Sequence, residues 1–316
     1  MKEYIYAVDV GGTDIKAGII DTSGNILASS KVKTSAFDKD LTLANQIYDL
    51  LKELEKASSL SVDDAVGIGI GLPGLIDTKN GNIRYSANLN ISEYPIVREL
   101  KKLINVPIKI ANDADVATLA ELHFGAGKGT NNFIMVTVGT GIGGGIVIDG
   151  KPLSRSRDYT GEIGHFKITD KKIMCGCGQM GCSEAYGSTR SLIALTKEAM
   201  KKNKDSLMWT KYNLDNISGK TVFEFKDVDN AAKGVFEEYI KRLGTIIVNL
   251  SNILLPELIV ISGAISQQKS TLTRPLEQYV NSHIFAGHIK YKIKIKTAVH
   301  TKDAGIIGAS CLFKEE

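Results

Sequence analysis

The chain has 316 residues, of which 43% are hydrophobic and 23% charged, and its formal net charge is +4. This composition is typical of a soluble globular protein with room for two domains, and it excludes the disordered, fibrous and disulfide-scaffold classes. The mild charge, without a strong lysine or arginine stripe, argues against a nucleic-acid partner. No apolar stretch approaches the length of a membrane span and no leader pattern precedes the first strand-like run, so we expect a cytoplasmic protein without a membrane partner.

The first third of the chain alternates strand and helix patterns. Runs of apolar and β-branched residues between turn formers predict an antiparallel meander of three strands within residues 4–30. Apolar residues at helical spacing predict a helix over residues 41–57. The alternation indicates an α/β domain. Its remaining predicted elements are a buried strand at 65–70, loop and helix over 84–103, a strand at 106–113 and a short helix at 115–124.

Residues 133–150 predict a second meander that resembles the first. At an offset of 128 residues, five of fourteen positions are identical, and both copies have the order strand, glycine-rich turn, strand. We therefore expect duplicated lobes that face one another across a central cleft, with boundaries at 1–114, joined by the C-terminal helix 303–316, and at 115–302. The identical residues are Val8, Val10, Gly11, Ile20 and Asp21, matched by Val136, Val138, Gly139, Ile148 and Asp149.

The rest of the second half gives weaker signals. Residues 200–220 have poor periodicity and are expected to form an insertion or an irregular helix. A long helix is predicted from 230 to 253, a strand at 257–263, and the start of the final helix at 303–310.

Each meander contains a turn that could hold phosphate. Glycine adopts positive φ freely and has no side chain to block an anion, so backbone N–H groups could converge there. Each turn alone could equally be a tight hairpin, and neither has the Walker A or Rossmann context. The turns consist of Gly11, Gly12 and Thr13, and of Gly139, Thr140 and Gly141.

Three further residues extend this predicted nucleotide site. Asp9 ends the first strand, where a carboxylate beside polyphosphate requires an intervening cation such as Mg²⁺, or else bonds its own backbone in the turn. Lys16 follows the first turn and is grouped with the same site. Gly263 ends a predicted strand with Ala264, where small residues would let an adenine ring lie against the backbone, although this could equally be a helix entry.

Three cysteines are clustered among glycines, with a histidine ten residues upstream of the first. In a reducing compartment such a cluster favours metal binding or redox chemistry over disulfides. Four soft ligands would form a closed tetrahedral site suited to structural Zn²⁺. The alternative is a set of small buried residues with a redox thiol, although thiols separated by glycines pack poorly. The candidate ligands are His165, Cys175, Cys177 and Cys182, whereas Cys311 is expected to be an ordinary buried residue.

The motifs together resemble two known groups of proteins. "DVGGTDIKAGIID", "VTVGTGIGGG" and "VISGAIS" occur in the order of the phosphate-1, phosphate-2 and adenosine motifs of the sugar kinase, actin and Hsp70 superfamily. "GEIGH" followed by "CGCGQMGCSE" resembles the signature of the ROK family (repressor, open reading frame, kinase), and the resemblance extends over nearly the whole chain. It implies a two-lobed actin-like ATPase (ribonuclease H-like) fold, bound ATP and Mg²⁺, structural Zn²⁺, and a homodimer or homotetramer.

Asp113 is the candidate catalytic residue. It lies where a predicted strand ends and a helix follows, so it could accept the proton of a sugar hydroxyl, or it could cap the helix, as Asn112 could. In the family the matching aspartate is the catalytic base. The resemblance places Asn112, Glu162, His165 and Glu184 on the sugar, with His165 also on zinc. Asn88, in one of two loops expected at 71–77 and 86–90, is a further candidate sugar ligand.

The resemblance implies an ATP-dependent hexose kinase that acts on the 6-hydroxyl of a hexose, amino sugar or glucoside. Asp115 and Asp14 depart from the residues usual in the family, which leaves nucleotide or substrate preference open. A non-catalytic sugar-sensing regulator is the alternative, although the family's DNA-binding members carry a further N-terminal helix-turn-helix and here the first strand begins near residue 4. An actin-like or chaperone ATPase is a third hypothesis, which the cysteine cluster disfavours.

Overall fold

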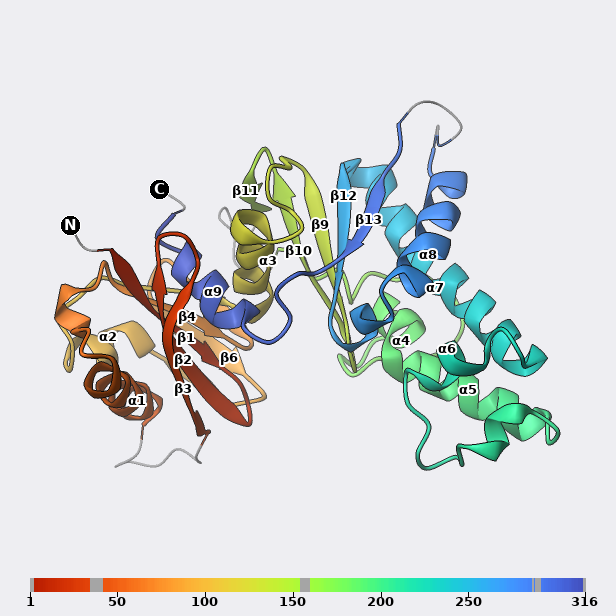
Figure 1. Cartoon of the computed structure of the whole chain (residues 1–316), viewed down its shortest axis with the longest axis horizontal. Helices are drawn as coiled ribbons and strands as arrows, with labels where there is room; N and C mark the ends of the chain where they lie inside the picture. The colour runs from red at the N-terminus through yellow and green to blue at the C-terminus, as the bar shows by residue number, and fades with distance from the viewer. Residues whose placement is uncertain (1–2, 35–41, 154–159, 286, 288–290, 315–316) are drawn as a thin grey trace. The chain divides into compact units, whose positions relative to one another are not determined.

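The computed structural model describes residues 3–34, 42–153, 160–285, 287 and 291–314. The chain forms two compact units, the first from Met1–Gly129, Lys151–Thr160 and Val299–Glu316, the second from Thr130–Gly150 and Gly161–Ala298. Compared with the expected lobes, the first unit also includes the helix after residue 112. Both chain ends belong to this unit (Figure 1).

The first unit is built on a five-stranded sheet of order β3-β2-β1-β4-β8. β1 (Tyr4–Val10), β2 (Asp14–Asp21) and β3 (Ile26–Lys33) form an antiparallel meander, which confirms the prediction for this segment. β4 (Ile68–Leu72) pairs with β1 in parallel, and β8 (Ile108–Asn112) pairs with β4 in the same way. Parallel pairing requires a crossover, and helices supply it.

Alternate residues of β1 face different helices. Tyr6 and Val8 belong to the core that includes α1 (Leu43–Ser58), whereas Ala7 belongs to the core of α3 (Asp113–Phe124) and α9 (Ala304–Cys311). Since successive side chains of a strand point to opposite faces, α1 covers one face and α3 and α9 cover the other. Thr42 begins α1 by accepting a hydrogen bond from the N–H of Asn45, which matches the predicted helix.

Glycines allow α9 to approach its neighbours backbone to backbone. A Cβ atom on Gly69 of β4 would lie 1.9 Å from the carbonyl oxygen of Ala309, and one on Gly308 would lie 1.6 Å from that of Val116 in α3. No side chain fits at either position. This close packing of α3 against α9 places α3 in the first unit.

The first unit also contains a small sheet that was not predicted from the sequence. β5 (Leu75–Asp77), β6 (Asn82–Ser86) and β7 (Ile91–Tyr94) form an antiparallel sheet, followed by α2 (Ile96–Lys101). The expectation of loops at 71–77 and 86–90, and of loop and helix alone over 84–103, is therefore wrong in part. These strands have three to five residues, too few for a clear alternating pattern.

The second unit contains a sheet with the same arrangement, in the order β10-β9-β12-β13. β9 and β10 are antiparallel, whereas β12 pairs in parallel with both β9 and β13. Both sheets thus have an antiparallel hairpin on one side of the first strand and parallel strands on the other. The strands are β9 (Phe133–Val138), β10 (Ile142–Ile148), β12 (Leu258–Ser262) and β13 (Lys294–Thr297). The two-residue strand β11 (Lys151–Pro152) follows β10 in the chain, and its residues are assigned to the first unit.

The two hairpins differ by one residue in their turns. Val10 pairs with Ile15 and Val138 pairs with Ile142, so residues 11–14 form the first turn and residues 139–141 the second. The constant offset of 128 therefore fails after the turn. By strand pairing Ile20 corresponds to Val147, and the matches of Ile20 with Ile148 and of Asp21 with Asp149 are not structural equivalences.

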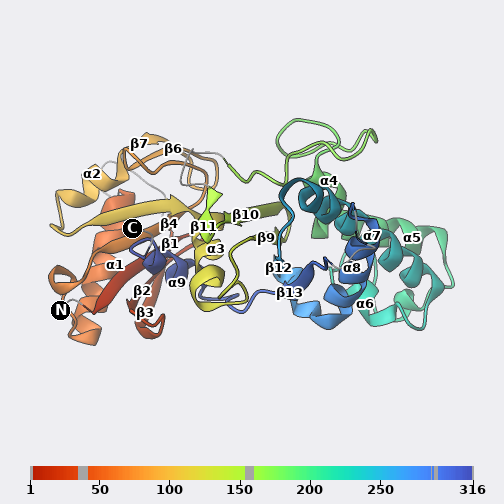
Figure 2. The same ribbon diagram turned by 90° about the horizontal axis from the view of Figure 1, so that it is seen from above.

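The helices of the second unit follow the metal-ligand candidates in the chain, and all of them precede the last strand, β13. α7 confirms the predicted long helix, and it lies beside α8 in both views (Figures 1 and 2). Residues 200–220 include a short 3₁₀ helix, Leu207–Thr210, over its own small core of Met200, Met208 and Ile217. The helices are α4 (Ser183–Gly187), α5 (Thr189–Lys202), α6 (Thr221–Phe225), α7 (Asn230–Leu254) and α8 (Ser270–His283).

None of the helices in the described part of the chain combines the length and the apolar character that a membrane span requires.

Candidate functional site

The first glycine turn joins β1 to β2 in the first unit. The N–H of Gly11 donates to the carbonyl oxygen of Asp14 at 2.9 Å, and the Thr34 hydroxyl donates to that of Gly11 at 2.7 Å. Gly12 and Thr13 are exposed, and no hydrogen bond within the described residues uses their N–H groups. Two backbone donors therefore remain available to an anion at this turn.

The glycines of the turns are not needed for a left-handed backbone, and only some of them are needed for space. The glycines with positive φ do not include Gly11, Gly12, Gly139 or Gly141, so the expectation based on positive φ is wrong. A Cβ atom on Gly12 would lie 3.2 Å from the backbone oxygen of Asn88. Close approach of a neighbouring group thus explains the choice of glycine at Gly12.

Two carboxylates lie near this turn. Burial, followed by the negative charge of Asp113, raises the pKa of Asp9, and the charge of Lys16 partly offsets the rise. A Cβ atom on Gly305 would lie 2.2 Å from the carboxyl carbon of Asp9, so Asp9 packs against the first turn of α9. The Lys16 ammonium forms an ion pair with Asp303 just before that helix. A cation held between Asp9 and Asp113 would relieve their repulsion.

Asn112 and Asp113 mark the junction of β8 and α3, and α3 begins two residues earlier than predicted. The side-chain oxygen of Asn112 caps the helix by accepting a 2.8 Å bond from the N–H of Ala114, and its amide donates to the carbonyl oxygen of Gly74 at 2.8 Å. Asp113 Oδ1 also lies 2.8 Å from the N–H of Ala114, and the side chain is exposed. The capping residue is Asn112, and the side chain of Asp113 is exposed in the first turn of α3.

The second turn, in the second unit, is held at both ends. Its own Gly139 N–H donates to the carbonyl oxygen of Gly141 at 3.0 Å. The N–H of Thr189 donates to Gly139 at 2.9 Å, and Ile142, just after the turn, donates to Glu184 Oε2 at 3.2 Å. Within the described residues, no hydrogen bond uses the N–H groups of Thr140 and Gly141. The turn therefore also offers two backbone donors.

Gly263 lies beside the second turn. A Cβ atom at this position would lie 2.5 Å from the carbonyl oxygen of Val138, the residue that precedes the turn. Its φ of 82° belongs to the region that favours glycine. A 3₁₀ helix, Ala264–Gln268, begins immediately after it, so the strand end and the helix entry weighed from the sequence are both present.

The four candidate metal ligands come together in the second unit. The ligand atoms of His165, Cys175, Cys177 and Cys182 all lie within 4.8 Å of one another. The Sγ atoms of Cys177 and Cys182 are 3.7 Å apart, as are His165 Nδ1 and Cys175 Sγ. Around a tetrahedral Zn²⁺ the expected separations are about 3.8 Å for two sulfurs and about 3.6 Å for sulfur and nitrogen. The donor set and its spacing fit such an ion.

The electrostatics of the cluster also require a cation for the thiolate form. Burial raises the pKa of the Cys175 thiol to about 12, and burial likewise raises the pKa of Cys182. A backbone hydrogen bond from Gln179 lowers the pKa of the exposed Cys177. The imidazole turns Nδ1 toward Cys175, so Nε2 is the nitrogen left for another partner.

The two candidate glutamates differ in their surroundings. Glu184 Oε2 accepts the bond from Ile142, and its Oε1 lies 3.5 Å from Cys175 Sγ. Glu162 is exposed, and its carbonyl oxygen accepts a 3.1 Å bond from the N–H of His165. Glu184 therefore touches both the metal cluster and the second turn, which its position in the sequence did not indicate.

Comparison with known proteins identifies the group to which this arrangement belongs. The profile of the ROK family matches residues 5–316. The chain belongs to the ROK family. It is 33% identical to a glucokinase of Halalkalibacterium halodurans over 312 residues, which is 98% of this chain and 94% of the relative.

A second relative shows the regulatory side of the family. A xylose repressor of Caldicellulosiruptor bescii is 26% identical to this chain, covering 96% of this chain and 76% of the repressor. Among solved structures, a ROK family glucokinase from Streptomyces griseus in complex with glucose and AMPPNP superimposes with a TM-score of 0.78 at 28% identity, covering 98% of each chain. The fold is the α/β actin-like ATPase fold.

Sequence reasoning missed several residues that support the turns of this ROK protein. Thr34 and Thr189 hold the two turns, and Asp303 pairs with Lys16. Ser188, whose hydroxyl accepts a bond from the N–H of Ser191, is the N-cap of α5. The run "GSTR" at 187–190 carries this capping signal, which could have located the helix start and with it Thr189.

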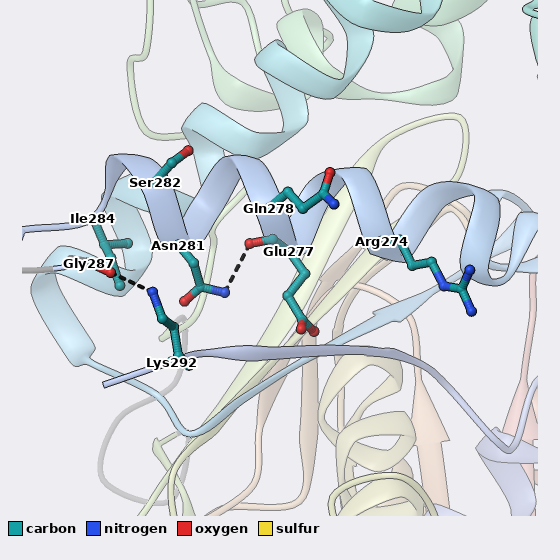
Figure 3. Close-up of a pocket in the computed structure, with 8 residues that line it drawn as sticks. All are labelled: Arg274, Glu277, Gln278, Asn281, Ser282, Ile284, Gly287 and Lys292. Carbon is teal, nitrogen blue, oxygen red and sulfur yellow. Dashed lines mark hydrogen bonds between the residues drawn. The ribbon is translucent and has the colours of Figure 1, made fainter. Parts of the chain in front are cut away.

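An open pocket of about 710 Å³ lies elsewhere in the second unit, along α8 (Figure 3). Lys292 Nζ donates to the carbonyl oxygen of Gly287 at 2.7 Å, and Asn281 donates to that of Ile293 at 2.9 Å. Arg274 lies at the far end of the helix from Lys292 (Figure 3). None of the predicted site residues lines this pocket.

Proposed function

We propose that this ROK family protein is an ATP-dependent sugar kinase that phosphorylates the 6-hydroxyl of a hexose, amino sugar or glucoside. Similarity to glucokinases over nearly the whole chain supports a sugar kinase. The observation that carries the proposal is the proximity of Asp9 to Asp113 and to a turn with unused N–H groups. Burial, and then the negative charge of Asp113, raises the pKa of Asp9. Phosphoryl transfer needs a carboxylate near the acceptor hydroxyl to accept its proton, and fixed positive or dipolar groups near the phosphates.

In this proposal the two turns bind the phosphates of ATP. The N–H groups of Gly12, Thr13, Thr140 and Gly141 would donate to phosphate oxygens. Asp9 would hold Mg²⁺ with retained waters, and Gly263 would leave room for the adenosine. Bound Mg²⁺ would supply neutralisation of phosphate charge. Lys16, which forms an ion pair with Asp303, would partly neutralise the negative charge of Asp9.

Asp113 is proposed as the general base. Its place in the chain is set by the start of α3, which the Asn112 cap and the Asn112 bond to Gly74 fix. It would accept the proton of the 6-hydroxyl as that oxygen attacks the terminal phosphate. The sugar hydroxyls would be held by Asn88, Asn112, Glu162, His165 and Glu184.

The cysteine cluster is proposed to hold structural Zn²⁺. His165, Cys175, Cys177 and Cys182 would complete its coordination, which leaves no open position for a Lewis acid role. Because His165 turns Nδ1 toward the cluster, Nε2 would donate to a sugar hydroxyl in a fixed direction.

The test is a panel of sugars with ATP, comprising glucose, fructose, mannose, N-acetylmannosamine, N-acetylglucosamine and β-glucosides, with ADP release as the readout. We expect ADP release that depends on one or a few sugars. The Asp113→Asn variant should lose about 10²–10⁴-fold in kcat while it keeps sugar binding. Full turnover by this variant would remove Asp113 from the role of base, and sugar-independent release would overturn the kinase proposal.

The regulatory alternative is favoured by one observation, the similarity to the xylose repressor. A regulator would bind a sugar in the same panel, measured by a thermal shift, and release no ADP with any of them. Sugar-dependent release distinguishes the kinase from this alternative.

The proposed partners are the sugar and further copies of this chain, in a cytoplasmic homodimer or homotetramer. No nucleic-acid or membrane partner is proposed. Ile253 and Phe285 are exposed by 78% and 88%, and contact with a second copy would cover these side chains. Light scattering should give twice or four times the chain mass of 34.2 kDa, and a monomer would contradict this part of the proposal.

A further inference from the structure

We propose that Glu184 is a positioning residue that couples metal binding at the cysteine cluster to nucleotide binding at the Gly139–Gly141 turn. This inference rests on the proposed function, because it takes the turn to be a phosphate site. It adds a second task for Glu184 and makes the affinity for ADP depend on the metal.

The first step is the position of the Glu184 carboxylate. One oxygen accepts the N–H of Ile142, the first residue after the turn, at 3.2 Å, and the other lies 3.5 Å from the Sγ atom of Cys175. A single side chain therefore contacts a strand end that determines the turn and a ligand of the metal cluster. Because both oxygens belong to the same rigid carboxylate, a movement of the Glu184 side chain changes both contacts together.

The second step is the lack of room around this carboxylate. A Cβ atom on Gly141 would lie 2.3 Å from Glu184 Oε2, and one on Gly164 would lie 2.1 Å from the carbonyl oxygen of Ile142. The segment that carries His165 thus packs backbone to backbone against the strand that follows the turn. Closely packed groups respond to a displacement together, because no cavity absorbs it.

The third step is the connection from Glu184 to the other end of the turn. The N–H of Glu184 donates to Gly164 at 2.8 Å, and its carbonyl oxygen accepts the N–H of Ser188 at 3.1 Å. Thr189, the next residue, donates its N–H to the carbonyl oxygen of Gly139. Residues 184–189 therefore form hydrogen bonds at both ends of the turn, from Glu184 to Ile142 and from Thr189 to Gly139. Cys182, just before this segment, belongs to the metal cluster.

The consequence is a linkage between two binding equilibria. With the metal bound, Cys182 anchors the start of the helix that carries Glu184, and the bond from Ile142 to Glu184 keeps the N–H groups of Thr140 and Gly141 aligned. Without the metal, part of the free energy of nucleotide binding is used to order this segment. Coupling of this kind typically changes affinity by about 5–150-fold.

The experiment measures binding of Mg·ADP by calorimetry in the absence of sugar. Four samples form a cycle, namely the zinc-loaded and chelator-treated forms of the wild-type chain and of Glu184→Gln. We expect zinc removal to weaken ADP binding at least about five-fold in the wild type and to have little further effect in the variant. Equal losses from zinc removal in both chains, or no loss in either, would overturn the coupling.

Asp170→Asn is the matched control. Asp170 lies on the same segment, its side chain is 98% exposed and it pairs only on the surface with Lys167. This variant also removes one negative charge, and its ADP affinity should match that of the wild type. A loss as large as that of Glu184→Gln would show a general effect of charge and would contradict a specific role of the Glu184 carboxylate.

A reciprocal measurement covers the case in which the zinc-free chain unfolds. By linkage, ADP must raise the affinity for zinc by the same factor by which zinc raises the affinity for ADP. Competition with a chromophoric chelator should show tighter zinc binding with ADP in the folded wild type and no such gain in Glu184→Gln. If ADP binds and the zinc affinity does not change, the coupling is wrong and the proposed function is not affected. If the wild-type chain binds no ADP, both the coupling and the proposed function are wrong.

Discussion

The two glycine turns share a sequence pattern and a place in their sheets, yet they are supported by different means. The first is preceded by Asp9 in β1 and held from outside by the hydroxyl of Thr34. The second is preceded by Thr137 at the position that corresponds to Asp9, and Glu184 and Thr189 hold its ends. The carboxylate near the first turn belongs to the strand before it, whereas the carboxylate near the second turn belongs to Glu184 in the metal-binding segment.

This difference shows what a duplicated architecture preserves. Both copies keep the hairpin and two backbone N–H groups that no hydrogen bond within the described residues uses. The carboxylates near the two turns come from different elements, Asp9 from the strand before the first turn and Glu184 from the helix that follows the metal ligands. The following predictions test this contrast.

Removal of the metal should have the largest effect, and it should be confined to the second unit. Because the cluster ties residues 165–184 together, we expect Cys182→Ser to lose amide-exchange protection over 163–189 and to lower Tm by several degrees. Exchange in residues 4–33 of the first unit should stay as in the wild type. Protection that is unchanged around the second turn would contradict the supporting role of the cluster.

An alanine in the second turn should have an intermediate effect that depends on which glycine is changed. Gly141→Ala would displace the carboxylate of Glu184, whereas a Cβ atom on Gly139 meets no atom within 4 Å. We expect Gly141→Ala to weaken Mg·ADP binding about ten-fold, the cost of one charge-assisted hydrogen bond.

Gly139→Ala tests the second half of this prediction. The substitution should leave Tm unchanged because the position is open, and any loss of ADP affinity would then report direct contact with the ligand. Equal ADP affinities for Gly141→Ala and the wild type would show that Glu184 does not support the turn.

The smallest expected effect concerns the stability of the first unit without divalent ions. The pKa of Asp9 is raised above its ordinary value of 3.8, so ionised Asp9 lowers the stability of the fold as the pH rises through this range. Asp9→Asn should therefore raise Tm by roughly 1–3 °C at pH 7 and leave it unchanged below about pH 3, where both chains are neutral at this position.

Asp77→Asn should show the opposite pH dependence in the same measurement of Tm. Hydrogen bonds from Asn80 and the charge of Arg84 lower the pKa of the buried Asp77, so its ionised form stabilises the fold above the ordinary pKa and this contribution is lost in acid. This variant should have a lower Tm at pH 7, and the difference should shrink as the pH falls. A Tm change of the same sign for both variants would contradict the electrostatic contrast.

Local pattern was enough to predict much of this protein. The meanders, α1 and α7 follow from the spacing of apolar residues, and the cluster of cysteines with His165 follows from ligand chemistry. These features depend on neighbours within a few turns or strands of the chain. The sequence therefore established the α/β class, the repeated hairpins and the four ligand candidates.

Contacts between distant segments required the tertiary structure. The sheet β5–β7 escaped prediction because its strands are too short to show a period, and the offset of 128 failed because one turn is a residue shorter. The contact of Glu184 with Ile142 joins residues 42 positions apart, and the approach of Gly305 to Asp9 joins segments almost 300 apart. Packing decides such pairs, since the side chains involved have no period or spacing that a linear pattern could reveal.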